Sequence, residues 1–491
     1  SSGALRFAED GKYYRLKNGR DSPYFLNIGE VNGKDLSRLG DFYYKALKEG
    51  LSGEEIEDSE KEIENSNRCL LIYGIPEKGI PIALSLSMKS GVPFFYTRKV
   101  TKEYGEATLS KENVGKNVIG KLPRDGYKII LVDDVITSGA TKQEAYETLD
   151  SLGRFEYPLL LIALDRQEVG IDGKDAKKSF EEIRNTKVVA IANASDLCEY
   201  LKRNGYEKYA KRIANYLRVY GNKEAKNNAK KSIVEIEGSS YERIIPQKRS
   251  IIPACDFETI EEFENLVRET HELEVIGGYK IGSSLAIRYG LERLVDLAKK
   301  YAEKPIIYDH QKAGGDIPET SGKFMRNCKK AGVDAVIIFP LGGPETERAL
   351  MYHAFENEIA PIVGSMMTHR GFTTKEKGFV DENRILDAYI IAAEAGVNNF
   401  VVPSNNPAFV TKLTRELLVE DVIPIYYPTG IGAQGGDIQE LMNILYPEYY
   451  PSLEHPIDLH FIVGRSLYES KDRRNAAKQL EKMLATAEKI E

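Results

Sequence analysis

The clearest hydrophobic pattern in the first half of the chain is a short apolar run at 129–132 that ends in two adjacent acids. The run IILV is followed by Asp133 and Asp134, and then by the small and hydroxyl-bearing residues of 137–141. A continuous apolar run of this length predicts a buried strand of a parallel sheet. The stretch at 142–152 is helical in character, so we predict a strand–turn–helix unit here.

In the second half of the chain, strand-like apolar runs alternate with amphipathic helical stretches such as 258–271 and 381–395. The runs lie at 250–256, 273–280, 305–309, 335–340, 360–366, 400–404, 423–428 and 459–464. Eight β–α units in about 240 residues is the count and size of a (β/α)8 barrel. Barrels of this kind carry their chemistry on the carboxyl ends of the strands.

A polar segment at 219–249, rich in Lys and Asn, separates these two halves and is nearly free of apolar periodicity. The parts on either side are sensible sizes for single domains. We therefore predict an N-terminal α/β domain at 1–218, a linker at 219–249 and a barrel at 250–491.

Composition and charge exclude several classes of protein. The net charge of −7 argues against a broad nucleic-acid surface. No apolar run approaches the ~18 residues of a membrane span, and the N-terminus lacks the basic start and long apolar core of a signal peptide. The four cysteines are scattered and form no CxxC pair. We therefore expect a cytoplasmic protein with reduced thiols that binds neither nucleic acid nor membranes.

The strand–turn–helix unit at 129–152 also predicts an anion-binding site. Free backbone N–H groups at a helix N-terminus, together with the helix dipole, attract a phosphate group. Asp133 and Asp134 beside such a site suggest a ligand that carries both phosphate and hydroxyl groups, that is, a phosphorylated sugar. The alternative is an ordinary strand end with a capping aspartate.

The residues of 129–141 closely resemble the phosphoribosyl-diphosphate (PRPP) signature of type I phosphoribosyltransferases. In that family the two acids hold the ribose hydroxyls, and the loop that follows holds the 5′-phosphate. The resemblance implies a parallel sheet with flanking helices. It also implies that PRPP is bound by Asp133, Asp134, Thr137, Ser138, Gly139, Ala140 and Thr141.

Four further segments match, in order, the pattern of orotate phosphoribosyltransferase. They are LKNGRDSPYFLNIG (16–29), YGIPEKGIPIA (73–83), YTRKVTKEYGEA (96–107) and ALDRQE (163–168). Each of their cations could instead be an ordinary solvated side chain. The resemblance implies that the diphosphate is bound by Lys17, Lys78, Arg98, Lys99 and Lys102, of which Lys102 is also catalytic. It places the orotate ring and its carboxylate against Phe25 and Arg166.

The same resemblance implies a Mg²⁺-assisted transfer in which the metal is chelated by PRPP oxygens. Mg²⁺ needs few protein ligands when its substrate supplies oxygens, so we expect no metal site made by the protein itself. One position departs from the family, because Tyr104 stands where a lid histidine is common. Residues 1–250 contain no histidine at all, so proton handling by the lid is an open point.

In the barrel, charged residues follow the strand-like runs. Asp256, Lys280 and Asp309 come at the ends of the first three runs, and Arg465 follows the last. The glycine-rich segment 428–437 follows the seventh run, and barrels usually bind phosphate after strands seven and eight. Charges gathered at one end of a barrel could also form a structural ion-pair network. Their position at the catalytic face favours a function.

Residues 250–480 resemble orotidine 5′-phosphate decarboxylase. By that resemblance Asp309 crowds the departing carboxylate, Lys312 delivers a proton to C6 and Lys280 orders the array. Asp316 would come from a partner subunit, so that the barrel is active as a homodimer or larger assembly. The substrate would also be held by Asp256, Thr368, Gln434, Gly435, Gly464 and Arg465. No cofactor is implied, because the work is electrostatic.

One spacing departs from that family. Its usual pattern is D-x-K-x-x-D, whereas Asp309, Lys312 and Asp316 give D-x-x-K-x-x-x-D. An extra residue on each side of the lysine would reverse side-chain direction on a regular strand. A bulge or early turn must restore the geometry, and Gly314–Gly315 offers one for the second half.

Joined in this order, the two halves resemble the bifunctional UMP synthase family. The implied reactions convert orotate and PRPP to orotidine 5′-phosphate, and then to UMP and CO₂. One alternative joins the transferase to a barrel sugar-phosphate lyase such as a hexulose-phosphate synthase. The other is a regulator in which the phosphoribosyltransferase fold senses nucleotides and binds RNA.

Overall fold

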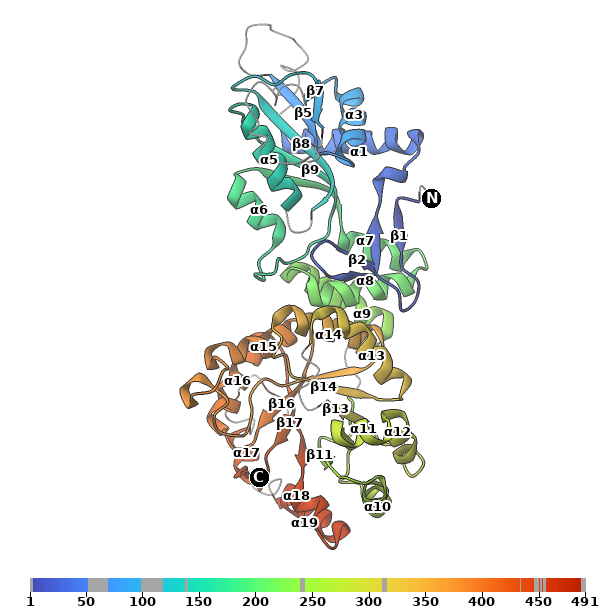
Figure 1. Cartoon of the computed structure of the whole chain (residues 1–491), viewed down its shortest axis with the longest axis vertical. Helices are drawn as coiled ribbons and strands as arrows, with labels where there is room; N and C mark the ends of the chain where they lie inside the picture. The colour runs from blue at the N-terminus through green and yellow to red at the C-terminus, as the bar shows by residue number, and fades with distance from the viewer. Residues whose placement is uncertain are drawn as a thin grey trace, which may run out of the picture. The chain divides into compact units, whose positions relative to one another are not determined.

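The structure is a computed structural model of the chain (Figure 1). It describes residues 3–51, 69–98, 118–136, 140–238, 243–310, 316–432, 434–445, 450, 453 and 456–486. The chain forms two compact units, Ser1–Ile236 and Glu237–Glu491. Among the described residues, no helix has the length and hydropathy that crossing a membrane requires.

The first unit is built on a six-stranded sheet with the strand order β10-β9-β8-β5-β6-β7. Its strands are β5 (Leu70–Gly74), β6 (Phe94–Thr97), β7 (Val118–Gly120), β8 (Lys128–Ile136), β9 (Leu159–Asp165) and β10 (Lys187–Asn193). All neighbours run parallel except β6 and β7. The predicted parallel sheet with flanking helices is therefore confirmed.

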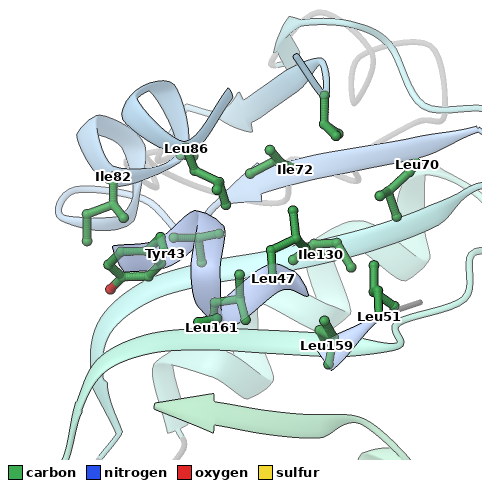
Figure 2. Close-up of a cluster of buried hydrophobic side chains, with 14 of the residues drawn as sticks. Tyr43, Leu47, Leu51, Leu70, Ile72, Ile82, Leu86, Ile130, Leu159 and Leu161 are labelled. Atoms are coloured by element: carbon green, nitrogen blue, oxygen red, sulfur yellow. The ribbon is translucent and has the colours of Figure 1, made fainter. Parts of the chain in front are cut away.

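Helices cover both faces of this sheet. Those that pack on it are α1 (Gly33–Gly50), α3 (Gly79–Ser90), α5 (Ala140–Leu152) and α6 (Ala176–Arg184). Helices α7 (Ala194–Arg203), α8 (Glu207–Tyr220) and α9 (Lys223–Glu237) follow β10 in the chain. Ile130 of β8 packs with Tyr43 of α1 and Leu86 of α3 (Figure 2). Its neighbour Ile129 belongs to a second cluster with Tyr146 of α5. Successive side chains of a strand face opposite ways, so a strand buried on both sides is apolar throughout.

Short antiparallel pairs precede the sheet. They join β1 (Leu5–Phe7) to β4 (Tyr24–Leu26) and β2 (Tyr14–Arg15) to β3 (Asp21–Ser22), and the 3-10 helix η1 (Ile28–Glu30) follows. This hairpin region carries Phe25 and Arg20 of the motif at 16–29.

The predicted linker 219–249 differs from the structure in its first half. Helix α8 continues to Tyr220, and α9 occupies Lys223–Glu237, most of it in the first unit. Ala225, Ala229 and Ile233 are buried along α9. Their spacing of four residues is that of one helix face. The sequence predicted a linker here because these three apolar residues are scattered among many Lys and Asn side chains.

The second unit is a closed barrel of eight strands, each hydrogen-bonded to the next in chain order. The strands are β11 (Arg249–Cys255), β12 (Tyr279–Gly282), β13 (Ile306–Asp309), β14 (Ala335–Ile338), β15 (Ala360–Val363), β16 (Asn399–Pro403), β17 (Ile425–Thr429) and β18 (Asp458–Val463). All pairs are parallel, including β11 with β18. The predicted (β/α)8 barrel is confirmed.

The helices of the barrel unit follow its strands. They are α10 (Ile260–Thr270), α11 (Ser283–Tyr289), α12 (Leu291–Lys299), α13 (Ser321–Lys330), α14 (Pro344–Glu356), α15 (Glu382–Glu394), α16 (Pro407–Val419), α17 (Ile438–Ile444), α18 (Arg465–Tyr468) and α19 (Arg473–Thr486), with the 3-10 helices η3 (Pro318–Thr320) and η4 (Thr374–Glu376). The second strand starts later than predicted. A Cβ added at Gly277 would lie 2.3 Å from Ser250 Oγ, so the chain before β12 is a close-packed turn.

Candidate active sites

The two acids of the first unit lie in the carboxyl-terminal part of β8, and each is paired with a lysine. Lys142 Nζ of α5 lies 2.6 Å from Asp133 Oδ2, and Lys78 Nζ lies 3.0 Å from Asp134 Oδ2. Backbone N–H groups donate to the other oxygens, Asp134 N to Asp133 Oδ1 and Val135 N to Asp134 Oδ1. The mutual repulsion of two buried carboxylates is thus balanced by two ammonium groups. The sequence did not single out Lys142 for this role.

Burial also affects the ionisation of Asp133. Burial raises the pKa of the Asp133 carboxyl, and the attraction of Lys142 offsets part of that rise. Carboxylate oxygens held in this way can accept hydrogen bonds from the hydroxyls of a sugar.

The turn that carries Lys78 is pressed against β8. A Cβ added at Gly79 would lie 2.3 Å from Val132 O, so no larger residue fits there. Glu77 takes a left-handed backbone with φ 81°, which costs free energy in a residue other than glycine. Lys78 Nζ also lies 4.9 Å from the centre of the Phe25 ring. The structure therefore brings together Lys78, Asp134 and Phe25, all three of them predicted site residues.

The other predicted PRPP-binding residues are only partly described. Lys17 and Arg98 are exposed. Ala140 and Thr141 open α5, as the strand–turn–helix prediction requires. Lys99, Lys102, Tyr104, Thr137, Ser138 and Gly139 lie outside the described residues. Their roles stay predictions.

Arg166 is buried within a polar cluster at the end of β9. Its Nε donates to Glu168 Oε1 at 2.6 Å, and its Nη2 donates to Ser22 Oγ at 2.9 Å. The guanidinium lies over the Tyr24 ring, 4.3 Å from its centre. Glu168 was not among the predicted site residues. Its place two positions after Arg166 in ALDRQE was the only signal for it in the sequence.

In the barrel, Lys280 of β12 lies between two carboxylates. Its Nζ is 3.2 Å from Asp309 Oδ2 and 3.4 Å from Asp256 Oδ1. Lys280 and Asp309 are buried, and Asp256 is partly exposed. Burial alone would lower the pKa of Lys280, but attraction by Asp309 and Asp256 outweighs it, and the pKa is raised. The ammonium therefore stays charged in a dry site.

These charges lie at one end of a cavity of about 410 Å³ at the carboxyl ends of the strands. The cavity is lined by Ala254, Asp256, Lys280, Asp309, Ile337, Phe339, Met366, Met367, Thr368, Val401, Thr429, Gly430, Ile431, Gln434, Ile462, Gly464, Arg465 and Tyr468. A cavity of this size, lined by both apolar and polar side chains, suits a small ligand that is oriented by a few polar groups of the protein. Of the predicted binding residues, Asp256, Thr368, Gln434, Gly464 and Arg465 line it. Tyr468 had not been predicted.

The glycine-rich turn after β17 shapes the cavity rim. Gly430, Gly432 and Gly435 take left-handed backbones with φ of 85°, 69° and 85°. Such backbones favour glycine and let N–H groups approach an anion. Asn405 Nδ2 donates to Thr368 O at 2.9 Å and to Gln434 O at 3.1 Å. Asn405 therefore holds the segments of Thr368 and Gln434 together. It was not predicted from the sequence.

His310 makes its contacts on the side of the strand opposite to Asp309. The Tyr308 hydroxyl is hydrogen-bonded to His310 Nδ1, and both rings pack near Phe324 of α13. Tyr308 and His310 are two residues apart, so they share a face that Asp309 does not. Neither lines the cavity. Lys312, Gly314 and Gly315 lie outside the described residues, and Asp316 is exposed.

Each of the two units is similar to a known protein family. The phosphoribosyl transferase domain family matches residues 45–193. The orotate phosphoribosyltransferase of Methylococcus capsulatus is 34% identical over 224 residues, covering 44% of this chain and 91% of that protein. The chain belongs to the orotate phosphoribosyltransferase family. The enzyme of Pseudoalteromonas translucida is 37% identical over 226 residues, again covering 44% of this chain and 91% of that protein.

The orotidine 5′-phosphate decarboxylase / HUMPS family matches residues 249–480, which include all eight barrel strands. A solved structure of orotidine 5′-monophosphate decarboxylase from Methanocaldococcus jannaschii, complexed with the inhibitor BMP, is 23% identical. It aligns with 49% of this chain and 99% of its own, with a TM-score of 0.40. The prediction of an orotate phosphoribosyltransferase joined to an orotidine 5′-phosphate decarboxylase, the two enzymes of UMP synthesis, is confirmed. Neither alternative is favoured.

Proposed function

We propose that this chain converts orotate and PRPP to orotidine 5′-phosphate and diphosphate, and then converts orotidine 5′-phosphate to UMP and CO₂. The observation that carries the proposal is the buried Lys280 held between Asp256 and Asp309 in the barrel cavity. It occurs in the same chain as an orotate phosphoribosyltransferase domain, whose product is the substrate that such a barrel would use.

In the first reaction, Asp133 and Asp134 accept hydrogen bonds from the ribose hydroxyls of PRPP. Lys78 binds the diphosphate close to the base, a role supported by its position between Asp134 and the Phe25 ring. A ring nitrogen of orotate loses its proton and forms a bond to C1 of the ribose as the bond from C1 to the diphosphate oxygen breaks, and the diphosphate takes up the proton. Arg166 holds the orotate carboxylate.

Mg²⁺ fits this site as a partner of the substrate. Asp133 and Asp134 each pair with a lysine. This donor set suits an ion whose ligands come mainly from PRPP oxygens. When bound, Mg²⁺ would neutralise charge on the diphosphate leaving group.

In the second reaction, Asp309 lies against the carboxylate on C6 and repels it. As the bond from C6 to the carboxylate breaks, negative charge develops on C6 and the ammonium groups stabilise it. Lys312 then gives a proton to C6, which completes UMP. Lys280 holds Asp309 and Asp256 in place through two ion pairs. Thr368, Gln434 and Arg465 hold the base and phosphate, and no cofactor takes part.

The matching family also includes HUMPS proteins, so the barrel reaction needs a direct test. Purified protein is incubated with orotate, PRPP and Mg²⁺ while loss of orotate absorbance and release of CO₂ are followed. We expect both, in equal amounts. Consumption of orotate without CO₂, with added orotidine 5′-phosphate stable, would overturn the barrel assignment. CO₂ from added orotidine 5′-phosphate without orotate consumption would overturn the transferase assignment.

We also propose that the active barrel is a homodimer or larger assembly in which Asp316 completes the partner subunit's site. Asp316 is exposed, and its backbone oxygen accepts a hydrogen bond from Thr346 Oγ1 at 3.0 Å, which holds the segment. Mixing inactive Lys312→Ala protein with inactive Asp316→Ala protein should restore some decarboxylation through hybrid sites. A fully active monomer at assay concentration would contradict this.

We propose a cytoplasmic location. All four cysteines are free, and Cys198, Cys255 and Cys328 are buried. Reduced thiols of this kind persist where the glutathione and thioredoxin systems operate.

A further inference from the structure

A cluster of three buried charged side chains joins the hairpin region, the end of β9 and helix α8. Arg166 Nε donates to Glu168 Oε1 at 2.6 Å, and Arg20 Nη1 donates to Glu168 Oε2 at 3.2 Å. The Tyr216 hydroxyl of α8 donates to Glu168 Oε1 at 2.9 Å. Arg20, Arg166 and Glu168 are only 4%, 2% and 3% exposed. Glu168 is thus the common partner of two arginines.

The cluster holds one more positive charge than negative. Burial would raise the pKa of Glu168, but Arg166 and Arg20 hold it below its ordinary value, so the carboxylate is ionised. These three side chains by themselves carry a net charge of about +1, and the Asp165 carboxylate also acts on the Tyr24 hydroxyl. The rings of Tyr24 and Tyr220 lie 4.3 Å and 4.8 Å from the two guanidinium carbons. Such contacts ease the burial of a cation but do not neutralise it.

The hydrogen bonds of Arg166 leave one side of its guanidinium available. Glu168 takes Nε and Ser22 takes Nη2, and no described residue accepts from Nη1. The buried Tyr24 hydroxyl beside it also has no hydrogen-bond partner among the described residues. Buried polar groups without partners are rare unless a ligand or water completes them. The cluster is therefore organised to receive an acceptor, and its charge favours an anionic one.

We infer that Glu168 and Arg20 are positioning residues that aim Arg166 and set the charge of the base-binding site, so that it selects a base bearing a carboxylate over a neutral pyrimidine. This inference rests on the proposed transferase function. Glu168 fixes the orientation of the Arg166 guanidinium group. Arg20 cancels the charge of Glu168, and without it the pair of Glu168 and Arg166 would be neutral and would lose its attraction for a carboxylate.

The test compares Arg20→Met with Arg20→Lys in the full chain. Loss of a buried charge partner should raise the KM for orotate about tenfold or more in Arg20→Met. The KM for PRPP should change by less than about twofold, because the cluster does not reach Asp133 or Asp134. The ratio of kcat/KM for orotate to that for uracil should fall. Arg20→Lys keeps the charge and should recover most of both effects.

A matched control is Arg212→Met. Arg212 is another buried arginine of the same unit, on α8, but it donates to the backbone oxygens of Ala8, Glu9 and Lys12 rather than to Glu168. We expect it to lower thermal stability without separating the KM for orotate from the KM for PRPP. Decarboxylation of added orotidine 5′-phosphate by each variant checks that the barrel is intact.

If Arg20→Met fails to fold, Tyr216→Phe decides, because it removes only the hydroxyl that donates to Glu168. A rise of about threefold or more in the KM for orotate alone supports the inference. Equal changes in both KM values, or no rescue by Arg20→Lys, would overturn it. Wild-type protein that prefers uracil to orotate would overturn it too. Wild-type protein that consumes no base at all would overturn the transferase function itself.

Discussion

Lys142 Nζ lies 2.6 Å from Asp133 Oδ2, at the point where the apolar part of β8 gives way to two acids. Together with Lys78 on Asp134, it explains how adjacent carboxylates are tolerated in a buried place.

The first prediction concerns these two acids. Asp133→Asn combined with Asp134→Asn should reduce orotate consumption about a hundredfold or more, because neutral amides leave Lys78 and Lys142 unpaired and hold the ribose less well. Decarboxylation of added orotidine 5′-phosphate should be unchanged. Both rates are measured on the same preparation. Asp41→Asn, which removes an exposed partner of Lys89 in the same unit, serves as the control. Loss of both activities in folded protein would show that the two sites are misplaced.

The predictable parts of the structure are those in which burial produces a run of apolar residues in the sequence. The run at 129–132 is apolar because Ile129 and Ile130 belong to hydrophobic clusters on opposite faces of the sheet. The eight barrel strands were found for the same reason. Helix α9 was missed because its face is marked by only three small or isolated apolar residues, Ala225, Ala229 and Ile233.

Partnerships between residues far apart in the chain could not be predicted. Arg20 and Glu168 are 148 positions apart, and Asn405 reaches Thr368 across 37. Spacing patterns report neighbours on one strand or helix, whereas these pairs are created by the fold. The motifs named Asp133, Asp134 and Lys78, but they gave no signal for Lys142, which pairs with Asp133.

The second prediction concerns Lys280. Lys280→Ala should stop UMP formation and let orotidine 5′-phosphate accumulate, because it removes the ammonium that lies between Asp256 and Asp309. Removing one partner of a buried ion pair should also cost about 3–5 kcal/mol of barrel stability. Activity is measured by CO₂ release and stability by urea unfolding. The control is Lys299→Ala, which removes a half-exposed ammonium paired with Asp334.

A double variant separates the two effects of Lys280. Lys280→Met combined with Asp309→Leu replaces the buried pair with apolar groups, and it should recover much of the stability without recovering activity. Recovery of activity together with stability would mean that the pair is structural rather than catalytic.

The third prediction concerns the spacing around Lys312. Lys312→Ala should cost at least about a hundredfold in decarboxylation, since it removes a charge partner of the transition state from a dry site. His310→Asn should cost far less, because the Tyr308 hydroxyl already engages His310 Nδ1 on the face away from Asp309. Both are measured as CO₂ release from added orotidine 5′-phosphate. A lethal histidine change with a mild lysine change would mean that the register across 309–316 is wrong.

The last prediction concerns His460, which is buried in the barrel far along the chain from the catalytic segment. Its Nδ1 lies 2.8 Å from Ser250 Oγ, and its ring lies 5.2 Å from that of Tyr427. Burial, with a smaller effect of Arg243, lowers the pKa of His460 from 6.5 to about 3. The folded barrel therefore keeps this imidazole neutral at pH values where the unfolded chain protonates it.

Because the folded pKa is depressed, the contribution of His460 to stability is complete above pH 6.5 and is lost as the pH falls toward 3. The loss from this group alone should begin near pH 6.5 and approach about 1.4 kcal/mol per pH unit below it. Pulse proteolysis in urea, reading the band of the folded barrel at pH 7.5, 6.0 and 5.0, measures it. The stability difference between wild type and His460→Asn should shrink with each step downward in pH. His271→Asn, at a partly exposed histidine of the same barrel, is measured alongside as the control for loss of an imidazole elsewhere. A difference between wild type and His460→Asn that is constant across this range would show that the unfolded chain gains no proton at His460 relative to the folded one.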